Sequence, residues 1–158
     1  MADAHAAWSR TNRELEEWVP KARAEDVASP EAIVTALHDS VNGPKGAWNS
    51  DRLRSLCVPN VLFACLTVNE DGETTVNNCP LDDFIRLVEE KHAESGWYER
   101  TTEIVSVSTV AKKGGALAVV HYAGEASSTP DGMLEEQGET QAILMHDGVR
   151  WWVVADTW

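Results

Sequence analysis

From residue 99 onward, apolar and β-branched residues alternate loosely with polar ones, and this pattern predicts consecutive strands. Four runs share it: residues 99–110, 116–127, 135–146 and 149–158. Asp147-Gly148 stands between the last two runs, and this pair favours a two-residue hairpin turn because both residues tolerate positive φ. The final run carries three of the seven tryptophans. We therefore expect the last hairpin to close a curved antiparallel sheet.

The earlier part of the chain has a helical period. Ser29-Pro30-Glu31 combines a capping serine, a first-turn proline and an acidic residue, which together are typical of a helix start. Three helices are expected, over residues 30–42, 50–58 and 80–95, with a short strand pair at 61–68 and 73–77 between the second and the third. Because the helices and the later strands are segregated along the chain, the pattern predicts an α+β domain with helices packed on one face of the sheet.

A further helix is predicted over residues 4–19, where Trp8, Leu15 and Val19 share one face. Pro20 follows and disfavours helical backbone at the residue before it. We interpret residues 1–28 as an N-terminal helical extension and residues 29–158 as the main domain. The pattern leaves open whether the extension packs on the domain or on a partner.

Charge and cysteine content exclude several classes of function. The formal net charge of −13 argues against nucleic-acid binding and against docking on anionic membranes, since both depend on Lys and Arg. No apolar run is long enough to span a bilayer, and no secretory leader is expected near the start. Three cysteines without a C-x-x-C spacing suit a reducing compartment, so we expect a cytoplasmic protein. No two histidines stand at ligand spacing, and neither a metal nor a cofactor is predicted.

Three motifs in order carry a resemblance to a known fold. They are Asp51-x-Leu53-x-x-Leu56-x-x-Pro59-Asn60-Val61, Pro80-Leu81-Asp82-Asp83-Phe84, and the ending Asp147-Gly148-Val149-Arg150-Trp151-Trp152-Val153-Val154. Over residues 29–158 the chain resembles the nuclear transport factor 2-like superfamily, which includes polyketide-cyclase-type (SnoaL-like) proteins, ketosteroid isomerase and scytalone dehydratase. The resemblance implies a cone-shaped fold with three helices on a curved antiparallel sheet, a pocket between them, and homodimerisation through the sheet.

The resemblance also implies that one face of strand 116–127 and one face of the last strand line the pocket. A pocket histidine beside a carboxylate can move protons near neutral pH. His121 is therefore the candidate general acid–base, oriented by Asp156 or Asp39, and the opposing interpretation is a core or interface histidine bonded to a backbone carbonyl. The candidate ligand-binding residues are Tyr122, Trp48, His38 and Trp158.

Three functions stay open at this point. The first is a domain that binds a small hydrophobic or aromatic molecule in an apolar pocket. The second is a dehydratase-, isomerase- or cyclase-type enzyme with a pocket His-Asp pair. The third is a homodimeric protein-interaction module. The catalytic residues of the superfamily's isomerases have no residue-by-residue match here, so the sequence does not decide whether the chain is an enzyme.

Overall fold

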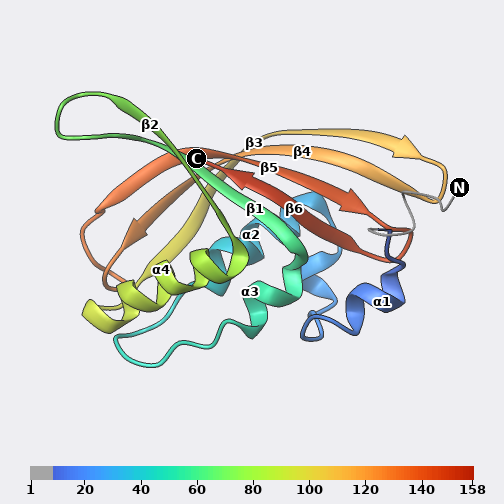
Figure 1. Cartoon of the computed structure of the whole chain (residues 1–158), viewed down its shortest axis with the longest axis horizontal. Helices are drawn as coiled ribbons and strands as arrows, with labels where there is room; N and C mark the ends of the chain where they lie inside the picture. The colour runs from blue at the N-terminus through green and yellow to red at the C-terminus, as the bar shows by residue number, and fades with distance from the viewer. Residues whose placement is uncertain (1–8) are drawn as a thin grey trace, which may run out of the picture.

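A computed structural model describes residues 9–158 and shows a curved sheet with the helices gathered on its concave side (Figure 1). The strands in these residues are β1 (Cys57–Val68), β2 (Thr74–Pro80), β3 (Tyr98–Lys112), β4 (Gly115–Ser127), β5 (Glu136–His146) and β6 (Trp151–Thr157). The helices are α1 (Asn12–Glu16), α2 (Pro30–Ser40), α3 (Asp51–Leu56) and α4 (Leu81–Glu94), with a 3₁₀ turn η2 (Glu25–Val27). The predicted α+β class is thereby confirmed.

The strand order is β2-β1-β6-β5-β4-β3, and one of its five pairings differs from the prediction. β1 and β6 run parallel, with Phe63 opposite Asp156, whereas the other four pairs are antiparallel. The sheet is therefore mixed, and the expectation of a purely antiparallel sheet is wrong. Two neighbouring parallel strands need a long connection between them. The connection from β1 to β6 is long enough because it contains all the other strands. Nothing in the local pattern of β6 could indicate this second partner.

The hairpin between β5 and β6 forms where predicted, but its turn is longer than expected. β5 ends at His146 and β6 begins at Trp151, so four residues form the loop. Within this loop, only Gly148 has positive φ, at 94°. A second residue with positive φ is not needed, because the Asp147 side chain stabilises the turn. Its Oδ1 accepts hydrogen bonds from the backbone N–H groups of Val149 and Arg150.

The three helices of the main domain are confirmed, and their ends follow local chemistry. The Ser29 side chain caps α2 by accepting from the N–H of Ala32 at 3.1 Å. In the N-terminal segment, α1 is much shorter than the predicted helix over residues 4–19. Thr11 and Glu14 form a capping box that starts α1 only at Asn12. Residues 1–8, with Trp8 among them, lie outside the described part of the chain.

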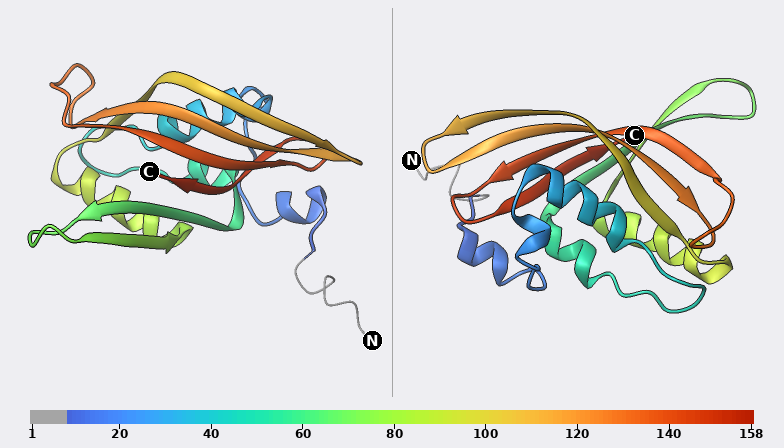
Figure 2. Two further views of the ribbon diagram at one scale, coloured as in Figure 1. Left: turned by 90° about the horizontal axis from the view of Figure 1, so that it is seen from above. Right: turned by 180° about the vertical axis from the view of Figure 1, so that it is seen from behind.

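The described N-terminal segment packs on the body of the domain. Asn12 donates a hydrogen bond to Asp147 in the β5–β6 loop at 2.9 Å. Glu16 pairs with Arg150 at 2.9 Å, and the Arg150 guanidinium is buried. Figure 2 shows α1 beside this end of the sheet in both views.

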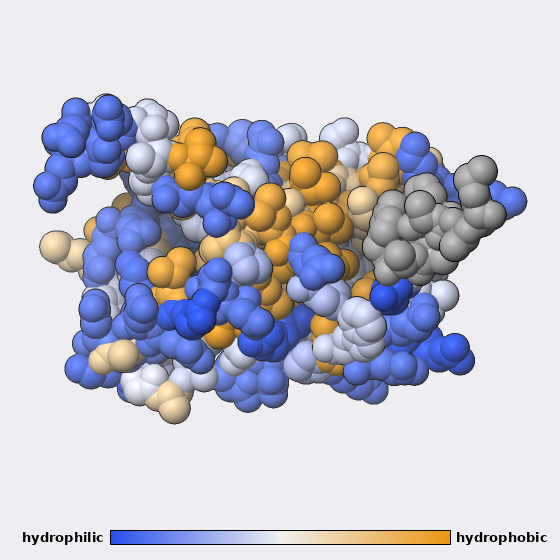
Figure 3. Space-filling view, in the orientation of Figure 1, coloured by the Kyte–Doolittle hydropathy of each residue, from blue (hydrophilic) through white to orange (hydrophobic). Residues whose placement is uncertain are grey.

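The core lies between the sheet and the helices. Inward-facing side chains of α2, α3, β4, β5 and β6 meet there and exclude water, among them Ile33, Leu53, Val120, Leu144 and Val153. In Figure 3, hydrophobic residues gather at the centre, where sheet and helices meet, while hydrophilic ones cover the tip of the β1–β2 hairpin. Beside α4, the inward positions of β4 and β5 are Gly124 and Gly138; the His38 ring fills the space next to Gly124, whereas the space next to Gly138 is open. This open space forms a hollow.

Candidate functional site

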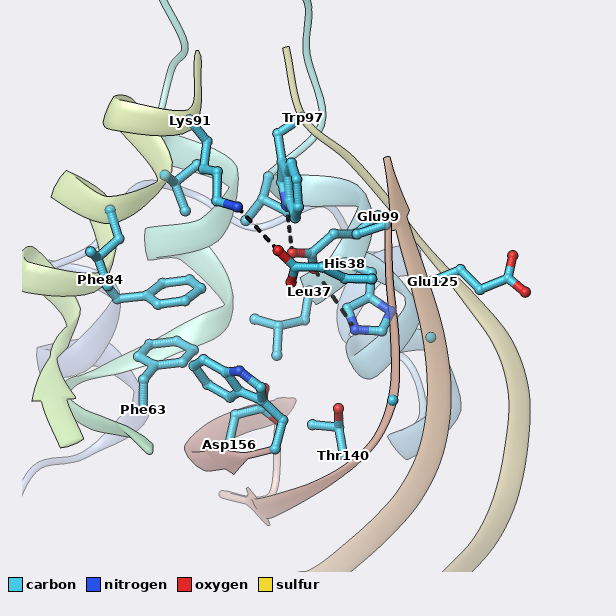
Figure 4. Close-up of a pocket in the computed structure, with 18 of the residues that line it drawn as sticks. Leu37, His38, Phe63, Phe84, Lys91, Trp97, Glu99, Glu125, Thr140 and Asp156 are labelled. Carbon is cyan, nitrogen blue, oxygen red and sulfur yellow. Dashed lines mark hydrogen bonds and ion pairs between the residues drawn. The ribbon is translucent and has the colours of Figure 1, made fainter. Parts of the chain in front are cut away.

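A cavity of about 400 Å³ lies between α4 and the inner face of the sheet. Side chains from α2, β1, α4, β3, β4, β5 and β6 line it (Figure 4). Gly124 and Gly138 face each other across the β4–β5 pair, and a Cβ built on Gly138 would meet only open space. Cavities of this size commonly hold small molecules, so this hollow is the candidate site.

One wall of the cavity is aromatic. The rings of Phe63 and Phe84 stack with centroids 4.1 Å apart, and Phe84 meets Trp158 edge-on at 5.9 Å. Trp158 is held in place by its backbone. Its backbone N–H donates to the carbonyl of Ala64 at 3.0 Å, and its carbonyl accepts from the backbone N–H of Leu66 at 2.9 Å. These stacked and edge-on rings present a continuous apolar surface, which suits an apolar ligand.

A buried hydrogen bond joins two polar residues at the floor of the cavity. The Tyr122 hydroxyl donates to Asp156 Oδ1 at 2.9 Å, and both side chains are buried. Burial raises the pKa of Asp156 to about 7, although the hydrogen bond from Tyr122 opposes the shift. Burial also raises the pKa of Tyr122, so its hydroxyl keeps its proton. Asp156 therefore changes charge close to neutral pH.

A second cluster of polar residues connects β3 to α2. Trp97 Nε1 donates to Glu99 Oε1 at 2.7 Å, and His38 Nε2 lies 3.9 Å from Glu99 Oε2. His38 Nδ1 also lies 2.9 Å from the hydroxyl of Thr101. Burial raises the pKa of Glu99 to about 7 and lowers the pKa of His38 to about 4, so at neutral pH the imidazole is uncharged.

Gly124 is what allows His38 to reach the sheet. A Cβ at this position would collide with the His38 ring, which also packs against Tyr122 with centroids 5.1 Å apart. The absence of a side chain at Gly124 therefore lets the His38 ring pack directly against β4, and the position of this glycine determines where the imidazole lies.

The rim of the cavity is bridged by an ion pair. Lys91 Nζ, on α4, lies 3.1 Å from Glu136 Oε1 on β5 and 3.9 Å from the centre of the Trp97 ring. Its side chain is half-exposed. Glu90 and Glu94 also contribute to the rim from the same helix.

The structure brings some of the predicted site residues together. His38, Asp156 and Trp158 line the cavity. Tyr122 packs against the His38 ring and donates a hydrogen bond to Asp156. Trp48 does not line the cavity. Its ring stacks on the buried His92 with centroids 5.7 Å apart, and its indole Nε1 donates to the Ser40 carbonyl. These placements leave the binding roles themselves as predictions.

The predicted pairings of His121 are not formed. His121 alternates with Tyr122 along β4, so its side chain lies on the outer face of the sheet, where Nε2 bonds Glu139 at 2.5 Å. Asp156 bonds Tyr122 on the inner face. Asp39 lies elsewhere, 3.8 Å from Arg52. The prediction that His121 pairs with Asp156 or Asp39 inside the pocket is therefore wrong, because the sequence gives the alternation of a strand without saying which face turns inward.

Sequence reasoning missed several cavity residues. The sequence pattern predicts a strand at Glu99 and a helix at Lys91, and nothing in it marks either residue as part of a site. Phe63 and Phe84 are apolar residues of a predicted strand and a predicted helix, and nothing in the sequence marks them as a binding wall. The Trp97-x-Glu99 spacing is the one local signal, because alternate strand residues share a face.

Neither the family models nor the curated proteins that were compared contain a match to this sequence. Within residues 9–158, no three His, Cys, Asp or Glu side chains are grouped so that they could hold a metal ion. No helix in that part of the chain is long and apolar enough to cross a membrane.

Proposed function

We propose that this protein is a cytoplasmic member of the nuclear transport factor 2-like superfamily that binds a small hydrophobic or aromatic molecule. The cavity of about 400 Å³ carries this proposal, since it combines an aromatic wall with a few polar groups. The curved sheet with helices on its concave side supports the fold assignment and its cone-like shape.

Filling the cavity tests the proposal. Gly138→Trp places an indole in the open space beside β5, and we expect it to weaken binding of the neutral probe N-phenyl-1-naphthylamine about tenfold or more, measured by probe fluorescence. Gln141→Trp is the matched control, because Gln141 faces outward on the same strand, and it should bind like the wild type. Equal affinity of the Gly138→Trp variant and the wild type would contradict the proposal.

A proton-transfer enzyme is the second candidate function. It is favoured by Asp156 and Glu99, two cavity carboxyl groups whose pKa values of about 7 let each donate or accept a proton at neutral pH. Asp156, bonded to Tyr122, would take the role that the sequence suggested for His121. Under this function, Asp156→Asn abolishes turnover of a bound substrate without releasing it.

We further propose that two copies pair through the outer face of the sheet. Leu117 and Val119 of β4 lie opposite Met145 and Ile143 of β5, and all four side chains are about two-fifths exposed. Such a contiguous apolar patch is typical of an interface. We expect a dimer by light scattering at micromolar concentration, and Ile143→Lys should produce a monomer. A wild-type protein that is monomeric under the same conditions would exclude this assembly.

A further inference from the structure

The cavity is lined by an excess of negative groups. Six lining residues carry carboxyl groups: Glu90, Glu94, Glu99, Glu125, Glu136 and Asp156. Glu125 points away from the cavity and pairs with Arg100 (Figure 4). Lys91 is the only lysine or arginine of the lining, and His38 is uncharged at neutral pH. A ligand with its own negative charge would therefore be repelled.

One group of polar residues lies across the cavity from the aromatic wall, while Asp156 lies beside Phe63. Figure 4 shows Lys91, Trp97, Glu99 and His38 gathered on one side, while Phe63 and Phe84 face them from the other. The lining is thus suited to an elongated ligand with one charged end and one apolar body.

The position of the Lys91 side chain shows that the polar side of the cavity accommodates a positive charge. The Lys91 ammonium lies over the Trp97 ring, 3.9 Å from its centre, and 3.1 Å from Glu136. Trp97 in turn bonds Glu99. An aromatic face flanked by carboxylates attracts a cation, both through the ring quadrupole and through the charges. Because Lys91 is half-exposed on a flexible stem, its ammonium can move into solvent.

We propose that the cavity binds an amine, with the protonated nitrogen beside Trp97, Glu99 and Glu136 in the place of the Lys91 ammonium, and with the apolar body against Phe63 and Phe84. This inference rests on the proposed ligand-binding function and deepens it by naming the class of ligand.

The ionisation of Glu99 gives the proposal a pH signature. The charged or titratable groups around this carboxyl are His38 from α2, Lys91 from α4, Tyr122 from β4, Glu136 from β5 and Asp156 from β6. A bound ammonium favours the ionised form of Glu99, whose pKa is otherwise about 7. Amine affinity should therefore rise between pH 6 and pH 8 while a neutral ligand shows no such rise, and binding near pH 7 should release protons.

Three ligands with one ring system test the charge preference. They are 1-naphthylmethylamine, 1-naphthalenemethanol and 1-naphthoate, compared by isothermal titration calorimetry at pH 7.5. We expect the amine to bind about tenfold tighter than the alcohol, and the carboxylate to bind most weakly. An alcohol that binds as tightly as the amine, or a carboxylate that binds best, would overturn the proposal and leave the pocket intact. If neither these ligands nor N-phenyl-1-naphthylamine binds, the proposed ligand-binding function fails as well.

Two variants locate the amine site. Lys91→Met removes the competing ammonium, so it should tighten amine binding about threefold or more and should not tighten carboxylate binding. Glu99→Gln should weaken amine binding about tenfold and leave the alcohol unchanged. Glu89→Gln, a neighbour on α4 outside the cavity lining, is the control for net charge. Weaker amine binding by the folded Lys91→Met variant would overturn the proposal, because it would show that Lys91 assists the ligand.

Discussion

Replacing Asp156 with asparagine is expected to stabilise the protein at pH 8 by about 2 to 4 kcal/mol and to have little effect at pH 4. In the folded protein Asp156 keeps its proton up to a pKa of about 7 because it is buried, whereas a free aspartate ionises near its ordinary pKa of 3.8. Between these two pH values the folded state holds a proton that the unfolded state has released. The free energy of unfolding of the wild type must therefore fall as the pH rises through this window.

Asparagine removes this pH dependence while keeping the hydrogen bond. Its side-chain oxygen can accept from the Tyr122 hydroxyl as Asp156 Oδ1 does at 2.9 Å. Urea unfolding at pH 4, 6 and 8 measures the difference. Glu99 contributes a slope of the same sign in both proteins, so the difference between them reports Asp156 together with its coupling to Glu99. A variant that is less stable than the wild type at pH 8 would show that Asp156 is not held in a charge-excluding site.

The second large effect is expected at Arg150, where Arg150→Ala should destabilise the protein by about 3 to 5 kcal/mol. The guanidinium is buried, pairs with Glu16 at 2.9 Å, donates to the carbonyl of Ser55, and stacks 3.6 Å from the centre of the Trp152 ring. Its removal leaves a carboxylate and a buried carbonyl without their donor and takes the stacking partner from the indole.

Two further variants separate these contributions. Arg150→Lys keeps the charge but loses the planar fork, so an intermediate loss is expected. Glu16→Gln keeps an acceptor for Arg150, so it should cost about 1 kcal/mol in urea unfolding. If Arg150→Ala changed the free energy of unfolding by less than about 1 kcal/mol, the N-terminal segment would not be docked through this residue.

The predictable part of the fold is the part that neighbouring residues specify. Ser29 and Pro30 start α2, and Asp147-Gly148 begins the last loop, because caps and turns depend on side chains a few positions away. The alternation of β4 was predicted for the same reason. Its inward face was not, and this is why Tyr122 reaches the cavity side while His121 lies outside.

The cavity itself depends on residues that are far apart in the chain. Its polar side joins Glu136 of β5 to Lys91, Trp97 and Glu99, and apart from the Trp97-x-Glu99 spacing no local pattern marks these residues. Local patterns also could not show that Asp156 would be buried beside Tyr122 with its pKa near 7.

By itself, the sequence determined the α+β class and the order and type of the elements of the main domain, because these depend on the periodicity of neighbouring side chains. Only the tertiary structure decided the parallel pairing of β1 with β6, the face of β4 that turns inward, and the hollow beside Gly138. The physical reason is that pairing partners, burial and the electrostatic surroundings of a side chain are set by atoms that approach only when distant segments pack together.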